Sequence, residues 1–163
     1  YGDIVSLDFC VAVEGLITDA ALSVVAGTTR SKEVAKLLKT TEESLQAGIK
    51  IVKNTVKVGS ISAAIAKVLN TQRYGIVKDL VGHGVGHEMH EEPNIPNYGR
   101  AGKGPVLYTG MTIAIEPMAT LGSERVYLDR DGWTIKTWDG SLAAHFEHTV
   151  LITDSGAEVL TTL

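Results

Sequence analysis

The sequence predicts an α+β fold in which a mainly antiparallel sheet is covered on its outer face by two helices. Large apolar residues alternate with small or polar ones along residues 4–13, 111–118 and 145–152, which is the period of a strand with two unlike faces. Residues 31–56 instead repeat apolar positions at helical spacing, with charged residues between them. Together these patterns favour a layer of strands against a layer of helices.

The chain begins with a predicted hairpin. One face of residues 4–13 carries large apolar side chains and is expected to be core, whereas the other carries small or polar ones, including Asp8. A turn signal at residues 14–15 predicts that residues 16–25 return as a second strand carrying Asp19. Asp8 and Asp19 can then face each other across the hairpin.

Two amphipathic helices are predicted next. The first covers residues 31–56. Ser60 is the expected N-cap of a second, shorter helix whose inward positions include Ile61 and Ile65. Gly59 is expected to separate the two helices.

The second half of the chain combines loops and strands. Residues 74–104 are rich in glycine, histidine and proline and are predicted to form an ordered loop region that carries function. Residues 111–118 and 145–152 follow as strands. Their alternation places Glu116 and Glu147 on small or polar faces, as it does for Asp8.

Composition describes an ordinary globular chain. The 163 residues are 44% hydrophobic and 21% charged, which favours one domain over residues 1–163. A net charge of −4 without a basic run argues against nucleic acid, and the apolar stretches are shorter than the roughly 18 residues of a membrane span. The single cysteine, Cys10, favours a reducing, cytoplasmic compartment. Because Tyr1 opens directly onto a strand, the chain is expected to be cut from something longer.

Five side chains of the kinds that bind metals lie in apolar or glycine-rich surroundings: Asp8, Asp19, His83, Glu116 and Glu147. A buried carboxylate without a partner costs several kcal/mol, and no arginine lies in the four acidic segments, so cations are expected there. Five ligands exceed what one divalent ion normally takes from protein. We therefore expect two ions that share bridging carboxylates, with Mn²⁺, Fe²⁺, Co²⁺ or Zn²⁺ suited to this ligand set.

Each residue taken alone also has an ordinary structural explanation. A lone strand aspartate such as Asp8 is more often a bulge or edge residue. His83 could be a turn histidine between two glycines, or it could form a three-histidine zinc site with His87 and His90. The glycines argue against the helical geometry that would bring His83 and His87 together. No single position decides between these interpretations.

The combination of motifs resembles the type I methionine aminopeptidases of the creatinase-like, or pita-bread, metallopeptidase family. The resemblance runs over nearly the whole chain and implies a curved sheet with the ligands on its concave face. Seven segments carry it, in this order: Gly2-Asp3-Ile4-Val5-Ser6-Leu7-Asp8, Asp19, Gly82-His83-Gly84-Val85-Gly86, His90-Glu91-Glu92-Pro93, Gly110-Met111-Thr112 with Ile115-Glu116-Pro117, Asp131-Gly132-Trp133-Thr134, and Phe146-Glu147-His148-Thr149.

The resemblance implies a role for each ligand. Asp8 would chelate one ion and His83 with Glu116 the other, whereas Asp19 and Glu147 would bridge both. In the family, a hydroxide between the ions attacks the carbonyl that follows the N-terminal methionine of a peptide or nascent protein. Glu116 would help to shuttle the proton in this reaction.

The substrate side of the site is implied in the same way. His90 would hydrogen-bond the substrate or the tetrahedral intermediate. Trp133 and Met89 would line the pocket for the methionine side chain. His87 and Glu88 occupy variable positions with no role to assign.

The family's N-terminal strands and helices are expected to be missing from this chain, together with a second active-site histidine and part of the methionine pocket. Their loss is expected to leave an apolar face of residues 5–13 exposed and prone to association. The complete enzyme is expected to be a monomer.

Two rival interpretations remain open. One is an Xaa-Pro aminopeptidase or prolidase domain. Residues 90–93, 97–99 and 131–133 argue against it, because they resemble the methionine enzymes instead. The other is a non-catalytic pita-bread module that binds protein or RNA, since related folds host unlike functions. The intact set of ligands argues against the second interpretation.

Overall fold

The computed structural model describes residues 1–29 and 31–162. Its main sheet is antiparallel and runs in the order β1-β2-β11-β6-β4-β5, with β12 also paired to β11. The strands of this sheet are β1 (Ile4–Val13), β2 (Leu16–Val25), β4 (Gly82–Gly84), β5 (Glu91–Ile95), β6 (Thr112–Ile115), β11 (Glu147–Ile152) and β12 (Ala157–Val159).

Two smaller sheets and two helices complete the described fold. The three-stranded sheet runs β10-β7-β3, and β8 pairs with β9 as a separate hairpin. These elements are β3 (Gly75–Ile76), β7 (Met118–Thr120), β8 (Val126–Leu128), β9 (Ile135–Thr137), β10 (Ala143–His145), α1 (Lys32–Ile49) and α2 (Val58–Thr71). Neither helix, within the described residues, is long and apolar enough to cross a membrane.

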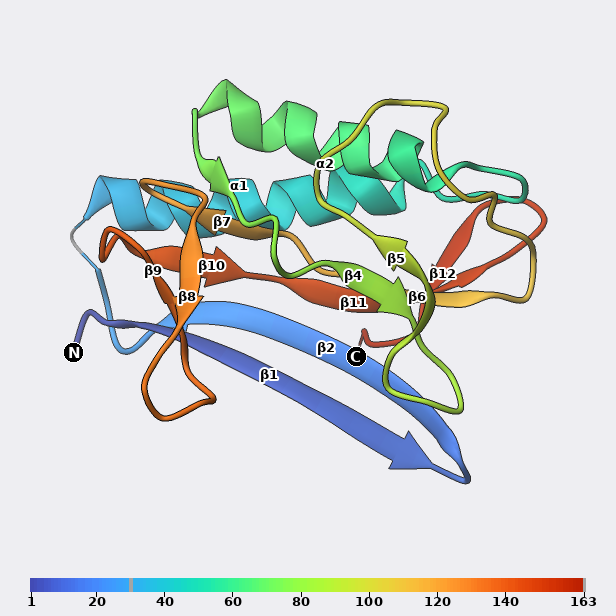
Figure 1. Ribbon diagram of the computed structural model, residues 1–163, viewed down its shortest axis with the longest axis horizontal. Helices are drawn as coiled ribbons and strands as arrows, with labels where there is room; N and C mark the ends of the chain where they lie inside the picture. The colour runs from blue at the N-terminus through green and yellow to red at the C-terminus, as the bar shows by residue number, and fades with distance from the viewer. Residues whose placement is uncertain (30, 163) are drawn as a thin grey trace.

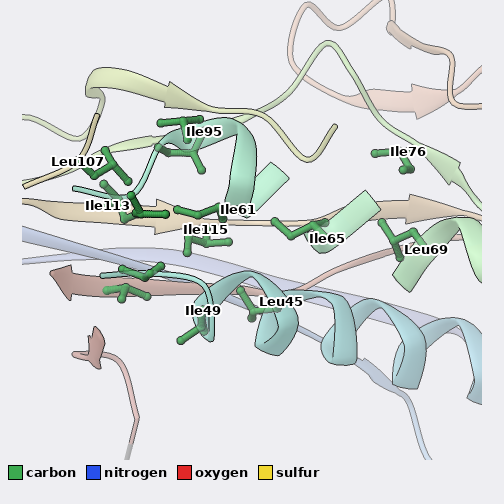
Figure 2. Packing of buried hydrophobic residues seen from close by; sticks show 14 of the residues in the cluster. Leu45, Ile49, Ile61, Ile65, Leu69, Ile76, Ile95, Leu107, Ile113 and Ile115 are labelled. Atoms are coloured by element: carbon green, nitrogen blue, oxygen red, sulfur yellow. The ribbon is translucent and has the colours of Figure 1, made fainter. Parts of the chain in front are cut away.

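The hydrophobic core lies between the helices and the middle of the main sheet. Figure 1 shows α1 and α2 side by side on one side of the sheet. Leu45 of α1 and Ile61 and Ile65 of α2 are fully buried and face Ile113 and Ile115 of β6 (Figure 2). Burying one such side chain stabilises the fold by about 1.5–3 kcal/mol, so this layer anchors the strands that carry the polar face.

The first helix is shorter than its hydrophobic periodicity predicts. Ser31 caps it as an extended residue whose hydroxyl accepts a hydrogen bond from the Val34 amide at 3.2 Å, but the helix ends at Ile49 and not near residue 56. Val52 and Val56 are nevertheless buried, because the turn that follows the helix packs against the same core. The apolar spacing therefore predicted correctly which residues are buried, but the predicted end of the helix was wrong.

The predicted boundary between the helices was also wrong. The second helix begins at Val58, so Gly59 and Ser60 lie inside its first turn. The Ser60 hydroxyl accepts a hydrogen bond from the Gly102 amide at 3.0 Å and does not cap the helix. A Cβ at Gly59 would collide with the Arg100 carbonyl oxygen. Both residues are therefore explained by the close approach of a later loop, which local sequence does not reveal.

Two predicted strands are each split, and they split at the same place in space. Residues 111–118 form β6 and β7 with a break at Glu116 and Pro117, and residues 145–152 form β10 and β11 with a break at Phe146. Pro117 has no amide hydrogen to continue a ladder. The Phe146 amide donates to the Pro117 carbonyl at 3.3 Å, which joins the two breaks. The two segments, residues 111–118 and 145–152, thus pass side by side between the small sheet and the main sheet.

Residues 74–104 contain three short strands, β3, β4 and β5, although the sequence predicted only an ordered loop region. Glycine has low strand propensity, so β4 (Gly82–Gly84) gave no strand signal. A Cβ at Gly82 would meet the Ala114 carbonyl oxygen of the neighbouring strand. These glycines allow β4 to approach β6 closely.

The apolar face of β1 is exposed, so the expectation that it is core was wrong. Its five large residues are 39% to 64% accessible: Val5, Leu7, Phe9, Val11 and Val13. The resemblance to the family predicted instead that this face would be exposed, and that prediction is confirmed. The helices cover the sheet beside β11 and β6, and between α1 and β2 there remains a groove of about 770 Å³ lined by Phe9, Leu22 and Leu38.

Because this face is large and apolar, we expect it to bind a hydrophobic dye such as 1-anilinonaphthalene-8-sulfonate and to cause association. The double substitution Leu7→Thr and Phe9→Thr should lower dye fluorescence and light scattering about twofold or more, with strand propensity retained. The matched control is Leu128→Thr with Ile135→Thr, because those residues are 59% and 44% exposed against 52% and 46% for Phe9 and Leu7. Equal reductions by both pairs would contradict a distinct apolar face.

Candidate metal centre

The register of the main sheet brings acidic side chains from three strands onto one face. Ala21 of β2 pairs with Asp8 of β1 on one side and with Glu147 of β11 on the other. Asp19 lies two residues before Ala21 and so points to the same face. His83 of β4 pairs with Ala114 of β6, which pairs with Thr149, two residues after Glu147. Small alanines between the ligating side chains leave room at the centre.

Asp19 is held in place through its backbone. Strands β2 and β11 pair at only two positions, and beyond them the Thr149 hydroxyl bridges the two chains. Its oxygen accepts a hydrogen bond from the Asp19 amide at 2.8 Å and donates to the Asp19 carbonyl at 2.8 Å. The carboxylate of Asp19 is therefore directed to the face it shares with Glu147.

His83 presents one ring nitrogen to the acids. Its Nδ1 lies 2.8 Å from the Gly84 carbonyl oxygen, so it is the nitrogen that carries the proton. The Nε2 atom then has a free lone pair and lies 3.4 Å from Glu116 Oε1 and 4.0 Å from Asp19 Oδ2. Histidines that bind metals are commonly oriented in this way by a backbone acceptor.

Glu116 occupies the break between β6 and β7. The Asn97 side-chain amide donates to the Glu116 carbonyl at 3.0 Å, and both residues are buried. Because Pro117 follows, the main chain turns out of the sheet at this point. The Glu116 carboxylate lies between two imidazoles, those of His83 and His145.

His145 is a member of the cluster that sequence reasoning missed. It ends β10, with Nδ1 3.8 Å from Asp8 Oδ2 and Nε2 3.6 Å from Glu116 Oε2. A signal existed, because the alternation of residues 145–152 places His145, Glu147 and Thr149 on one face. The residue was passed over because the family motif starts at Phe146.

The acidic cluster raises the pKa of its own members. Burial first, and then the charges of Glu116, Asp19 and Asp8, raise the pKa of Glu147 to about 9. Burial also raises the pKa of Asp8; His145 lowers it, and the charges of Asp19 and Glu116 raise it by smaller amounts, so the net direction is upward. These carboxylates are therefore poorly stabilised as anions without a cation among them.

Unpartnered buried atoms show that the residues fit such a cation. Asp19 Oδ1, Glu147 Oε1 and His145 Nε2 are buried and have no hydrogen-bond partner. Buried polar atoms are seldom left unpaired, so atoms that converge in this way fit metal ligation. Carboxylate oxygens with imidazole nitrogens suit a divalent transition ion.

Two overlapping groups of potential ligands share one residue. Asp19, His83 and Glu147 offer atoms within 4.8 Å of one another, and so do Asp8, His145 and Glu147. Glu147 belongs to both groups, which is the arrangement needed by a carboxylate that bridges two neighbouring ions. The bridging role expected for Asp19 stays a prediction, because Asp19 belongs to one group.

The residues expected on the substrate side lie at different distances from this cluster. The His90 ring packs edge-on against His83, with centroids 4.3 Å apart, and is itself exposed. Met89, 44% exposed, directly precedes it, whereas Trp133 is 86% exposed in the turn between β8 and β9. The pocket role of Met89 and Trp133 stays a prediction. His87 is exposed, and its Nδ1 lies 3.2 Å from the Gly15 carbonyl oxygen, at the turn of the first hairpin.

Comparisons with known proteins agree on one family. Residues 1–154 match metallopeptidase family M24. A methionine aminopeptidase of Clostridium acetobutylicum is 46% identical over 160 residues, which are 98% of this chain and 64% of that protein. The chain thus spans less than two thirds of the length of the curated relatives it matches.

Solved structures confirm the predicted α+β pita-bread fold. The crystal structure of a methionine aminopeptidase from Thermotoga maritima matches with a TM-score of 0.96 and 47% identity, over 99% of this chain and 65% of that one. A prolidase from Pyrococcus furiosus matches with a TM-score of 0.76 and 26% identity, over 99% of this chain and 42% of that one. The resemblance inferred from the seven sequence segments is confirmed.

Without metal, the stability of this chain is expected to fall as the pH rises from about 5 to about 9. The folded-state pKa of Glu147 is raised from 4.5 to about 9, so its protonated form stabilises the fold at low pH and that stabilisation is lost as the pH approaches 9. One such group contributes a slope of up to about 1.4 kcal/mol per pH unit. Urea unfolding in a chelator should show this slope.

Glu147→Gln should flatten that pH dependence, and Glu88→Gln, at an exposed carboxylate, should leave it unchanged. Adding Mn²⁺ at pH 9 should restore stability to the unsubstituted chain, because a cation can replace the proton. A slope that persists in Glu147→Gln would assign the effect to other groups.

Proposed function

This chain belongs to metallopeptidase family M24, and on that premise we propose that it is the metal-binding domain of a methionine aminopeptidase, with residues 1–163 forming one catalytic unit. The proposed reaction is removal of the N-terminal methionine from peptides and nascent proteins in the cytoplasm, by a monomeric enzyme. The observation that carries the proposal is the pair of ligand groups that share Glu147. Identity of 46% to a methionine aminopeptidase, against 26% to a prolidase, supports the choice of substrate.

The proposed centre holds two divalent ions, with Mn²⁺, Fe²⁺, Co²⁺ and Zn²⁺ all suited to its ligands. The residues that would hold them are Asp8, Asp19, His83, Glu116 and Glu147, with Asp19 and Glu147 shared between the two ions. When bound, the ions would activate a water and neutralise the charge that develops on the carbonyl oxygen of the first peptide bond.

Glu116 is proposed to transfer the proton of the attacking water. Its carboxylate is buried beside His83, and its backbone is fixed by Asn97 and the break before Pro117. A carboxylate in this position can accept a proton from the attacking water and pass it to the leaving amine. The hydrogen bond from Asn97 to the Glu116 backbone supports this role, because proton transfer requires a well-defined donor–acceptor distance.

His90 is proposed to stabilise the transition state. It is exposed but is held against the His83 ring at 4.3 Å between centroids, so it lies beside the centre on a side that a substrate can reach. An imidazole N–H there can donate to the oxygen of the tetrahedral intermediate. The methionine side chain of the substrate is proposed to contact Met89 and Trp133, which offer apolar and polarisable surface.

Metal stoichiometry tests the ligand assignment directly. The unsubstituted chain should bind about two Mn²⁺ or Co²⁺ ions by isothermal titration calorimetry. Asp19→Asn or Glu147→Gln should abolish two-metal binding, because the bridge between the ions is lost. Glu88→Gln should bind like the unsubstituted chain, since its carboxylate is exposed and lies outside both ligand groups. Equal losses in all three variants would overturn the assignment.

Cleavage of the peptide Met-Ala-Ser tests the proposed reaction. The assay compares this chain with a chimera in which it is joined to the part of the Clostridium acetobutylicum relative that lies outside the match. Release of methionine by either protein with Mn²⁺ or Co²⁺, and no cleavage of Ala-Pro-Ala, would support the proposal. Preferential cleavage of Ala-Pro-Ala would favour the Xaa-Pro aminopeptidase interpretation, and absence of both metal binding and cleavage would favour a non-catalytic module.

A further inference from the structure

We propose that His145 is a sixth metal-ligating residue and gives the ion on the Asp8 side its own imidazole. The inference rests on the metal centre of the proposed function and extends it, because the ligand set implied by the family resemblance contains one imidazole, that of His83. The structure instead places one imidazole in each of the two ligand groups.

The backbone of His145 is fixed at both of its polar groups. Its amide donates to the Ser23 hydroxyl oxygen at 2.9 Å, and that hydroxyl donates to the His145 carbonyl at 2.9 Å. The neighbouring Ser6 hydroxyl lies 2.7 Å from the same oxygen of Ser23. The side chain is only 15% exposed. The position of its Cα is therefore fixed, which lowers the entropic cost of bringing the ring to a ligand.

The distances around His145 match those of the ligand pairs already assigned. Two atoms that each lie about 2.1 Å from one ion are roughly 3.0–4.2 Å apart, depending on the angle between the two bonds. His83 Nε2 lies 3.4 Å from Glu116 and 4.0 Å from Asp19. His145 Nδ1 lies 3.8 Å from Asp8 Oδ2, which is in the same range. The 3.6 Å contact with Glu116 Oε2 is made by the other ring nitrogen, Nε2, and is a separate contact.

A direct ion pair explains the position of His145 less well. A charged hydrogen bond between imidazolium and carboxylate would close to about 2.7–2.9 Å, whereas both ring nitrogens of His145 lie more than 3.5 Å from the nearest carboxylate oxygen. Its Nε2 is buried without a hydrogen-bond partner, as is Oε1 of Glu147, which is only 2% exposed. Asp8, His145 and Glu147 offer ligand atoms within 4.8 Å of one another, so an ion among them would satisfy the unpartnered Glu147 oxygen.

The consequence is a more nitrogen-rich centre. With His145 the Asp8 group consists of two carboxylates and one imidazole, and so does the group of Asp19, His83 and Glu147. Imidazole favours Co²⁺ and Zn²⁺ over Mn²⁺ and Mg²⁺, so His145 should shift the preference of the Asp8-side site in that direction.

Counting imidazoles on bound Co²⁺ tests the proposal without an activity assay. In proton NMR of the Co²⁺-loaded chain, each ligated histidine should give one strongly shifted N–H resonance that disappears in D₂O. We expect two such resonances in the unsubstituted chain and one in His145→Gln. Calorimetry with Co²⁺ should show about a 10-fold to 100-fold weaker second ion in His145→Gln, with the first ion less affected.

His148→Gln is the matched control, because His148 lies on the opposite face of the same chain segment and its Nδ1 contacts Thr161 Oγ1 at 2.9 Å. It should keep both resonances. Two bound ions with a single shifted N–H in the unsubstituted chain would overturn the role of His145 and leave the proposed function standing. Failure to bind Co²⁺ at all would overturn both. Because the resonance count is made on the unsubstituted chain, it decides the matter even if His145→Gln does not fold.

Discussion

The cost of placing three buried carboxylates, those of Asp19, Glu116 and Glu147, beside the exposed carboxylate of Asp8 is the constraint on which the rest of this structure depends. Burial and then the charges of the neighbouring acids raise the pKa of Glu147 to about 9, and a cation among these carboxylates would offset that cost. The surrounding sequence serves that arrangement. Alanines at positions 21 and 114 leave space between the ligating strands, and the glycines beside His83 let its strand approach. A sheet built for packing alone would place larger side chains there.

The shared break of two strand pairs determines which side chains reach the centre. Strands β6 and β7 separate at Pro117, and β10 and β11 separate at Phe146, with one backbone hydrogen bond joining the two points. Glu116, His145 and Glu147 all lie within one residue of these breaks. An unbroken strand would present alternate residues at a fixed spacing along one face. The break instead directs residues from two sheets toward one point. More polar side chains therefore meet there than one face of a single sheet would supply.

The elements and the faces of candidate ligands that depend on local pattern were predictable from the sequence, and those that depend on distant contacts were not. Alternation placed Asp8, Glu116 and Glu147 on the correct faces, and the family motifs supplied His83. The predicted length of the first helix was wrong at Val52 and Val56. These residues are buried in the segment after the helix, and their spacing continues the periodicity of the helix. Alternation placed His145 on the same face as Glu147, but its proximity to Asp8 and Glu116, which lie far from it in sequence, was not predictable, and the family motif starts only at Phe146.

The geometry also couples the metal centre to the exposed apolar face, because both belong to the first hairpin. Asp8 and Asp19 lie on one face of β1 and β2, and the exposed residues of β1 lie on the other. The hairpin joins β11 through two residue pairs and the Thr149 side chain, and Ser23 joins it to His145 of β10. Ions bound between the hairpin and His83, Glu116 and Glu147 would therefore act as an added cross-link between the hairpin and the rest of the sheet. Occupancy of the metal centre should therefore increase the stability of the hairpin, since ligands that bind only the folded arrangement stabilise it.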